Sequence, residues 1–464
     1  MLHSDLIMAE RDNLLAISPL DGRYARDTES LTPYASEFGL IHARVRVEAD
    51  LLVAFSDVLP DVEPLGDGAR GELTRLVGEF SVADAEGVKG IEKITNHDVK
   101  AVELWLRSKL AGDSTFTDYL ELVHMGITSE DINNLAHNIN VGRMRGDVVL
   151  PGLREIGKTL DKNANQYADI PLLALTHGQP ATPTTIGKEF RVFEDRLWRG
   201  VDTLEGIRLT GKLNGATGGH NALAVAYPEV DWPDFARGFV ESYGFEYLPA
   251  TTQIEPHDSL ARIFNEASLV NTILTGFVRD KWAYISRGTF AQAAVETEVG
   301  SSTMPHKVNP INFENAEANL GLANAMLRYL ADTLPVSRFQ RDLRDSSTLR
   351  NIGTGFGYSV IAYNAIKRGL ARISPNEAAI AAELNEEWGV LGEAVQTVMR
   401  RYGVAGGYDK LKAATRGKEL DHDGYIALVT DLDLPNDARV RLLALTPATY
   451  VGYSAKIARE QLMD

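Results

Sequence analysis

The sequence contains no cysteine, and this absence excludes several kinds of chemistry at once. Without a thiol, the chain has no disulfide, thiolate zinc site, iron–sulfur cluster or cysteine nucleophile. No apolar stretch approaches the ~20 residues that a membrane-spanning helix needs. The first residues, MLHSDLIMAERDN, show neither the basic start nor the apolar run of an export signal. These absences predict a cytoplasmic protein that has no membrane partner.

Positive charge is also scarce. The chain has 47 Lys and Arg against 64 Asp and Glu, which gives a net charge of −17. A chain with this charge is repelled by phosphodiester backbones, so we expect no nucleic-acid partner. The ten histidines include no HExxH pair, and we expect neither a metal nor a cofactor. The length of 464 residues is enough for two to four domains.

Apolar residues recur at helical spacing over most of the chain. The run from Leu260 to Phe277 follows the alternating spacing of three and four residues that is typical of a coiled-coil seam, and the run from Ala316 to Leu334 does likewise. Similar patterns cover 132–160, as one long helix, and 186–207. No regular series of alternating strands is present, so the sequence predicts an all-α fold with a central bundle of long helices. Apolar stripes of this length also predict oligomerisation, with a larger monomeric core as the alternative.

Two breaks in the pattern suggest domain boundaries. The stretch AGDSTFTDY at 111–119 resembles a linker, and Ser374-Pro375-Asn376 resembles a helix stop followed by a capped restart. The prediction is therefore three helical domains, at 1–117, 118–373 and 374–464. Segments rich in Gly, Pro, Ser, Thr, His and Asn interrupt the long helices, and irregular segments of this kind often carry function: 171–183, 214–233 and 293–310.

The segment 293–310 gives the strongest local signal. It places Ser301 six residues before Lys307 and eight before Asn309. A hydroxyl near an ammonium group and exposed amides could form a base or nucleophile that also binds an anion. A plain surface loop is the alternative. The string GSSTMPHKVNP at 300–310 resembles the signature of the fumarase/aspartase superfamily, whose members release fumarate from succinyl compounds.

Further motifs narrow the resemblance to the adenylosuccinate lyase family, in its bacterial form of about this length. They occur in that family's order and extend from about residue 18 into the C-terminal region: SPLDGRY at 18–24, TNHDVKAVE at 95–103, HMGITSEDINN at 124–134, THGQPATPTTIGKE at 176–189, TTQIEPHD at 251–258 and SRFQRDLRDSSTLRN at 337–351. The resemblance implies a homotetramer in which the central helices of four chains form one bundle. It also implies that each active site takes segments from three chains.

The resemblance further implies the reaction. Members of the family cleave adenylosuccinate to AMP and fumarate, and SAICAR to AICAR and fumarate, and both reactions are steps of purine biosynthesis. Removal of the weakly acidic proton beside a carboxylate leaves a carbanion. An active site for this chemistry therefore needs a base, donors that stabilise the extra negative charge, and an acid that protonates the leaving nitrogen.

Three catalytic residues are implied by the same motifs. The general base is the first serine of the signature, Ser301, whose alkoxide requires stabilisation by neighbouring donors. The general acid is His177, because an imidazolium has a pKa near neutral pH and can deliver a proton to nitrogen. Glu314 is the carboxylate that orients this histidine.

Both substrates carry a phosphate and two carboxylates, so a chain with a net negative charge must gather cations locally. Four arginines lie within 337–350. Two of them, Arg338 and Arg344, are interpreted as solvated charges. The resemblance implies substrate contacts for a larger set: Arg23, Tyr24, Asn96, His97, Asp98, His124, Thr128, Ser129, Gln253, Lys307, Asn309, Asn315, Arg341, Ser346 and Arg350.

Two alternatives come from other functional classes. The first is another fumarate-releasing lyase of the superfamily, such as argininosuccinate lyase or aspartase. The arginine-rich segment and TTQIEPHD argue against it. The second is a non-enzymatic structural protein on the same scaffold. The presence of Ser301, Lys307 and His177 argues against that alternative.

Overall fold

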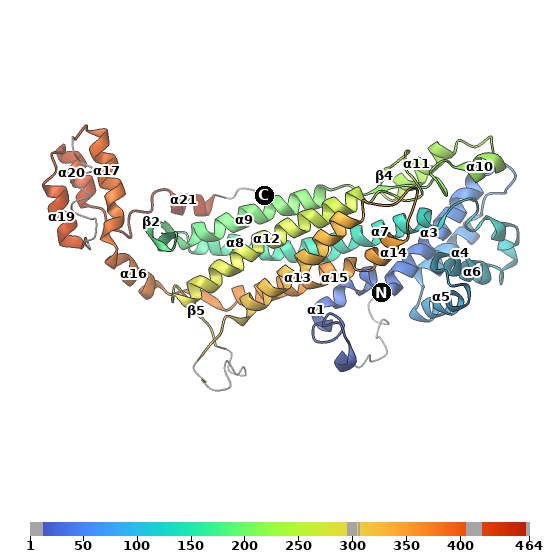
Figure 1. Ribbon diagram of the computed structural model, residues 1–464, viewed down its shortest axis with the longest axis horizontal. Coiled ribbons are helices and arrows are strands. Elements are labelled where there is room, and N and C mark those ends of the chain that lie inside the picture. The colour runs from blue at the N-terminus through green and yellow to red at the C-terminus, as the bar shows by residue number, and fades with distance from the viewer. Residues whose placement is uncertain (1–12, 295–303, 305–306, 405–419, 461–464) are drawn as a thin grey trace. The chain divides into compact units, whose positions relative to one another are not determined.

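The computed structural model describes residues 13–294, 304, 307–404 and 420–460, and these are predominantly helical (Figure 1). The predicted all-α class is confirmed. The chain divides into two compact units, of which the first comprises Met1–Gly152, Gly200–Thr272 and Ala318–Asn364, and the second comprises Leu153–Arg199, Ile273–Glu317 and Ala365–Asp464. The division into domains at 1–117, 118–373 and 374–464 stays a prediction.

Five long helices contain the boundaries between the two units. They are α8 (Leu150–Gln166), α9 (Ile186–Gly206), α12 (Asp258–Ser286), α13 (Ile311–Thr333) and α15 (Ile352–Leu370). The apolar seams predicted on α12 and α13 are buried throughout, from Leu260 to Phe277 and from Ala316 to Leu334. A stripe repeating every three to four residues stays on one face of a helix, and that face is removed from water.

The helices of the first unit surround α3 (Glu37–Val58), which packs against α4 (Asp67–Gly78), α5 (Val82–Thr95), α6 (Asp98–Leu110) and α7 (Ser129–Met144). Side chains at both ends of α5 fix its limits. Ser81 and Asp84 form a capping box at its start, and Asn96 adopts the left-handed conformation at its end. The remaining elements are short: η1 (Asn13–Leu15), α1 (Ala25–Thr28), η2 (Glu29–Leu31), α2 (Thr32–Ala35), η3 (Ser114–Leu122), α10 (Asn221–Ala226), α11 (Trp232–Ser242) and α14 (Arg344–Leu349).

The long helix predicted over 132–160 forms as α7 and α8, joined without a break by a π-helical turn, η4 (Arg145–Val149). The predicted linker at 111–119 is not wholly irregular, because η3 begins within it. Two strands of the first unit, β3 (Thr210–Gly211) and β4 (Glu246–Tyr247), pair in parallel.

The second unit contains a hairpin where the sequence predicted an irregular segment. Strands β1 (Pro171–Thr176) and β2 (Gln179–Thr185) pair antiparallel, with Thr176 opposite Gln179. The prediction was wrong here because the two strands carry Pro and Thr and lack the alternation of buried and exposed residues that marks a strand in a sequence. Strands β5 (Phe290–Gln292) and β6 (Ile373–Pro375) form a second small antiparallel sheet.

The C-terminal helices of this unit have a hydrophobic core of their own. It includes Leu391, Val395, Tyr425, Val429 and Leu442. This core belongs to η5 (Trp388–Leu391), α17 (Gly392–Arg401), α19 (His422–Thr430) and α20 (Asn436–Leu443), whereas α16 (Glu377–Glu386) contacts β1 and α21 (Ser454–Arg459) contacts β2.

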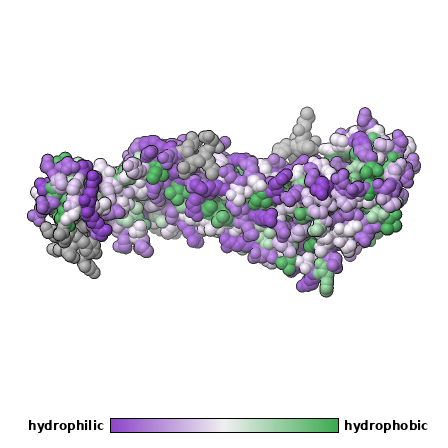
Figure 2. Space-filling view, turned by 90° about the horizontal axis from the view of Figure 1, so that it is seen from above, coloured by the Kyte–Doolittle hydropathy of each residue, from purple (hydrophilic) through white to green (hydrophobic). Residues whose placement is uncertain are grey.

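Hydrophilic residues predominate on the face shown in Figure 2, and hydrophobic residues occur there singly or in small groups, as on most protein surfaces. No helix among the described residues is long and apolar enough to cross a membrane.

Candidate active site

In the first unit, two predicted binding residues share one salt-bridge network. The Asp98 carboxylate, in the first turn of α6, accepts hydrogen bonds from Arg44 at 2.8 Å and from Arg350 at 3.1 Å. Burial would raise the pKa of Asp98, but Arg44, the Val99 N–H group and Arg350 together hold that pKa below its usual value. The ionised carboxylate therefore holds two guanidinium groups in place.

A third arginine, Arg341, is held by a separate pair of contacts. Its Nη1 donates to the side-chain oxygen of Gln253 at 3.2 Å, which joins two predicted binding residues. The same nitrogen lies 3.8 Å from Oε2 of Glu130. The backbone N–H of Gln253 donates to the carbonyl of Gln340, so the segment before α12 is tied to the segment that carries Arg341.

These arginines border one small cavity of about 10 Å³, which has room for about one water molecule. Three guanidinium groups and two carboxylates, those of Glu130 and Asp345, line this space, so an anion that binds there would compete with carboxylates for the arginines. The exposed side chain of Arg350 would have to move to admit an anion as large as a phosphate. The lining residues are Leu40, Arg44, Glu130, Asn133, His137, Arg341, Asp345, Ser346, Leu349 and Arg350.

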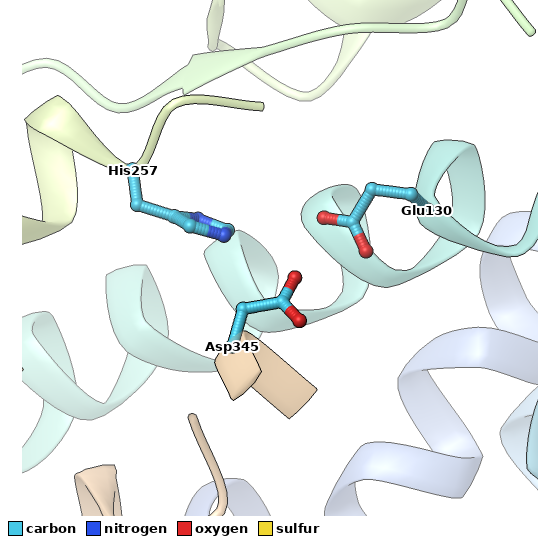
Figure 3. Close-up of side chains that lie close together, drawn as sticks. All are labelled: Glu130, His257 and Asp345. Atoms are coloured by element: carbon cyan, nitrogen blue, oxygen red, sulfur yellow. The ribbon is translucent and has the colours of Figure 1, made fainter. Parts of the chain in front are cut away.

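Two carboxylates that line this cavity belong to a buried group of two carboxylates and one imidazole, here called the acid–histidine cluster. Glu130 in the first turn of α7, His257 immediately before α12 and Asp345 in α14 point toward one another (Figure 3). One ligand atom from each lies within 4.8 Å of the others. These atom types could bind a divalent cation. Arg341 at 3.8 Å and an imidazole that can carry a proton already supply positive charge there, so we interpret the cluster as proton-binding.

His124 is fixed by a carboxylate that the sequence analysis did not single out. Its Nδ1 lies 2.6 Å from Oε1 of Glu48, a fully buried residue of α3. Burial would lower the pKa of His124, but the Glu48 charge and hydrogen bond outweigh burial and raise it. The backbone of His124 has φ of 60°, a conformation that is strained for a histidine.

This pairing makes stability depend on pH. Because the folded-state pKa of His124 lies above its unfolded value of about 6.5, the pair stabilises the folded state below that pH. The stabilisation is lost as the pH rises through the folded-state pKa. We therefore expect Glu48→Gln to lower the free energy of unfolding more at about pH 6 than at about pH 9. Urea denaturation at the two pH values measures the difference.

The control for this prediction is the same substitution in a His124→Asn background, since asparagine tolerates positive φ. Without the histidine, Glu48→Gln should act equally at both pH values. An effect of Glu48→Gln that is independent of pH in the wild-type background would contradict the proposed pairing.

The remaining candidates of the first unit lie at helix starts and ends. Thr128 precedes α7, and its N–H donates to Asp131 at 2.9 Å, while Ser129 begins the helix. The ring of His97 accepts a hydrogen bond from the backbone N–H of Lys100 at 3.1 Å and so caps the start of α6.

Two further candidates lie at the end of α5 and in α14. The side chain of Asn96, which follows α5, is exposed. Ser346 follows Asp345 in α14 and donates its N–H to that carboxylate at 2.7 Å.

Arg23 and Tyr24 lie just before α1. Arg23 is exposed, and its guanidinium carbon lies 5.9 Å from the centre of the Tyr24 ring. Tyr24 is half-buried and is the N-cap residue of α1. An exposed guanidinium beside an aromatic ring can bind an anion without the cost of leaving a buried charge unpaired.

In the second unit, the predicted acid His177 lies at the tip of the β1–β2 hairpin. His177 and Gly178 form its two-residue turn, with φ of 53° and 73°. Positive φ at both central residues is typical of the type I′ turns that fit the twist of a hairpin. The turn leaves the imidazole exposed. The paired strands β1 and β2 therefore present the imidazole of His177 to solvent at the end of the hairpin.

The other second-unit candidates surround the start of α13. Glu314, in its first turn, accepts a hydrogen bond from the indole of Trp282 at 3.0 Å. No hydrogen bond between described residues joins Glu314 to His177 within this chain. Lys307 is exposed, whereas Asn309 and Asn315 are half-buried. The predicted base Ser301 lies outside the described residues.

Strained backbone marks several of these histidines. Among the described residues, six non-glycine residues have positive φ: Asn96, His124, His177, His220, His257 and Phe339. Four of the six are histidines, and strain of this kind occurs most often at functional sites. His257 belongs to the acid–histidine cluster, and His124 and His177 were predicted from the motifs.

The sequence analysis assigned no role to Arg44, Glu48, Glu130 or Asp345. A signal for Arg44 and Glu48 was present, because these charges lie four residues apart within the apolar pattern of α3. Fully buried charges are rare unless they are paired. Glu130 and Asp345 are inside motifs that were quoted, but their roles depend on which neighbours the fold brings to them.

Comparisons with known proteins identify the family of this chain. The family described as "Lyase" matches residues 67–326, and "Adenylosuccinate lyase C-terminal" matches 337–451. An adenylosuccinate lyase of Escherichia coli K12 is 47% identical over 97% of this chain and 99% of its own length. Those of Haemophilus influenzae and Vibrio cholerae are 45% and 46% identical, and they cover 96% and 97% of this chain and 98% and 99% of their own lengths.

Solved structures show the same fold at low identity. A 3-carboxy-cis,cis-muconate lactonizing enzyme from Pseudomonas putida matches with a TM-score of 0.72 and 20% identity, over 93% of this chain and 95% of that one. A fumarate lyase from Mesorhizobium sp. BNC1 matches with a TM-score of 0.74 and 18% identity, over 93% of this chain and 96% of that one.

Fold and motifs together define an enzyme of the fumarase/aspartase superfamily, a lyase. Within that superfamily, the chain belongs to the adenylosuccinate lyase family. The resemblance predicted from the sequence is confirmed, whereas the roles of individual residues stay predictions.

Proposed function

We propose that this enzyme eliminates fumarate from adenylosuccinate to give AMP, and from SAICAR to give AICAR, in purine biosynthesis. The observation that carries the proposal is the gathering of three guanidinium groups, those of Arg44, Arg341 and Arg350, around one cavity in a chain of net charge −17. Local concentration of cations in an acidic protein suits a substrate with a phosphate and two carboxylates. The relatives named adenylosuccinate lyase support the choice of substrate.

In the proposed mechanism, Ser301 removes the proton from the carbon next to a succinyl carboxylate. The carbanion is delocalised into that carboxylate, and Lys307 and Asn309 stabilise the added negative charge. The bond between carbon and nitrogen then breaks, and its electrons go to the nitrogen. His177 protonates this nitrogen, which releases AMP or AICAR from fumarate. Glu314 from another copy of the chain would hold the imidazolium in position.

The binding residues divide by chemistry. Arg23, Arg341 and Arg350 are the cations for the phosphate and carboxylates, and Arg44 shares the Asp98 carboxylate with Arg350 and adds positive charge beside it. Ser129, Thr128 and Ser346 supply hydroxyl donors. The planar base can stack on Tyr24, and the side chains of Gln253, Asn315 and Asn96 can bond its polar edge. His97, Asp98 and His124 complete the proposed set.

A homotetramer is part of the proposal. Large apolar side chains on α12 and α13, including Leu269, Leu322 and Tyr329, are more than half exposed. Assembly would bury such side chains in a shared helical core and bring segments of several chains to each site. We further propose that the enzyme works in the cytoplasm.

Incubation of the purified protein with adenylosuccinate, followed by chromatography of the products, tests the proposed reaction. AMP and fumarate should appear in equal amounts. Argininosuccinate and aspartate, incubated in parallel, should remain intact. Release of fumarate from either of these compounds and not from adenylosuccinate would contradict the proposal in favour of another lyase activity of the superfamily.

Removal of one anchoring charge should mainly weaken binding. Hydrogen bonds to charged groups contribute about 1.5–3 kcal/mol, so Arg341→Ala should raise KM roughly 10–150-fold with a smaller change in kcat. Arg338→Ala is a matched control, since Arg338 lies on the same segment but is exposed and pairs with Asp342 at 3.1 Å. Steady-state kinetics measures both. Equal KM values for the two variants would remove Arg341 from the binding site.

A further inference from the structure

The acid–histidine cluster contains buried polar atoms that lack hydrogen-bond partners. Oε1 of Glu130, both ring nitrogens of His257 and Oδ2 of Asp345 are buried without such a partner among the described residues. The three residues are 1%, 1% and 7% exposed. An unpaired buried polar group costs free energy, and four such atoms gathered in one cluster beside the guanidinium of Arg341 point to a site that binds a proton, an ion or a water molecule.

Each member of the cluster lies within four residues of a predicted substrate contact in the sequence. Glu130 follows Ser129 in the sequence, Asp345 precedes Ser346, and His257 lies four residues after Gln253. Glu130 is also within 3.8 Å of Arg341. The cluster therefore joins the three segments on which Ser129, Gln253 and Ser346 lie. A change in the charge of the cluster therefore changes its electrostatic interaction with the guanidinium of Arg341.

Charged groups from several elements face Glu130. His257 before α12, Arg341 before α14 and Lys212 after β3 favour its ionised form, whereas Asp345 on α14 and burial oppose it. Oε2 of Glu255 accepts a hydrogen bond from the backbone N–H of His257 at 2.9 Å and lies 3.3 Å from the ring Nδ1, a charge contact without hydrogen-bond geometry. Arg44, His137 and Arg350 line the same cavity as Glu130. Arg341 is the member of this set that a bound anion would neutralise.

We infer that Glu130 is a positioning residue for Arg341, and that Glu130 takes up a proton when Arg341 binds the anionic group of the ligand. The inference rests on the proposed function for the identity of that ligand. While the site is empty, the Glu130 carboxylate holds the guanidinium near Gln253. When the anion binds, it pairs with the guanidinium of Arg341 in place of Glu130. The buried Glu130 carboxylate then takes a proton from solvent, because an unpaired buried charge is costly.

The carboxyl group of Glu130 can gain or lose a proton near neutral pH. Burial raises the pKa of Glu130 to about 7, although His257 and Arg341 act to lower it. A bound anion cancels the effect of Arg341 and raises this pKa further, so the complex binds more protons than the free enzyme does. By linkage, the affinity for the ligand falls as the pH rises above about 7.

Isothermal titration calorimetry with AMP in two buffers of different ionisation enthalpy measures the coupled protons. At about pH 7.5 the wild type should take up a fraction of a proton, at most about one, on binding AMP. Glu130→Gln should lose this uptake and the accompanying dependence of affinity on pH, and its KM should change more than its kcat. The phosphate of AMP titrates near pH 6 and contributes equally to all variants.

Glu194→Gln is a matched control, because Glu194 is a buried glutamate that pairs with another arginine, Arg191, at 2.8 Å. It should retain the proton uptake. Equal uptake in the wild type and Glu130→Gln would overturn the inference while leaving the proposed function intact. Failure of the wild type to bind AMP would contradict the proposed function, and the inference with it.

Infrared difference spectroscopy covers the case in which Glu130→Gln does not fold. In wild-type protein with isotope-labelled glutamate, AMP should produce a gain in absorption by protonated glutamate. An unchanged spectrum would overturn the inference. Prior dialysis against a chelator should alter neither measurement. A change on dialysis would show instead that the cluster exchanges a metal ion.

Discussion

Replacing His177 with alanine is expected to lower kcat by roughly 10²–10⁴, and Ser301→Ala should have an effect of the same size. Each substitution removes one half of the proposed proton transfer. Without the imidazolium the nitrogen leaves unprotonated, and without the serine the carbon keeps its proton. Stopped-flow or steady-state assays of fumarate release measure the loss. Circular dichroism should show an unchanged helical content, because His177 is exposed at a hairpin tip.

His177→Asn is the sharper variant, since asparagine tolerates the positive φ of 53° that the turn imposes. It removes the acid without adding backbone strain. Binding of AMP should persist in both His177 variants, because neither removes an arginine. A folded His177→Asn enzyme with near-normal kcat would show that another group protonates the nitrogen.

Mixing two inactive variants should restore activity. A tetramer of His177→Ala chains has no acid at any site, and a tetramer of Ser301→Ala chains has no base. If the two residues reach each site from different chains, random reassembly supplies both in about a quarter of the sites. Unfolding the variants together in equal amounts and refolding them should therefore recover about a quarter of the wild-type activity.

Two controls accompany this experiment. Each variant refolded alone must stay inactive, and native mass spectrometry must show mixed tetramers. An active site built within one chain could never be completed in this way, because every chain carries one lesion. Mixed tetramers without activity would contradict the shared site, even if both single variants lost activity as expected.

Local patterns in the sequence were sufficient to predict the helices. The seams on α12 and α13 are buried as their spacing predicts, because a helix with one apolar face is stable only when that face packs against the core. The family could also be predicted, since motifs such as GSSTMPHKVNP are contiguous. The hairpin at β1 and β2 was missed. Its strands carry Pro and Thr, and its register depends on a two-residue turn with positive φ at His177.

The candidate site was predicted only in part. Arg341 and Gln253, and Asp98 and Arg350, were named separately, and the structure joins each pair through hydrogen bonds. Nothing in the sequence indicates such pairings, because their partners lie 88 and 252 residues apart. The role of Arg44 was missed for the same reason, because the function of a charged residue in an apolar helix can be inferred only when its ion-pair partner is known.

By itself, the sequence determined the absence of thiol chemistry, the helical class, the family and the residues to which catalytic roles are assigned. These features depend on residue types and on short spacings along the chain. The tertiary structure alone decided which charges are buried together. Glu130, His257 and Asp345 come from α7, the start of α12 and α14, and their charge states depend on mutual distance and on exclusion from water. Electrostatic energies of this kind depend on separation in space, which folding sets and which no local pattern contains.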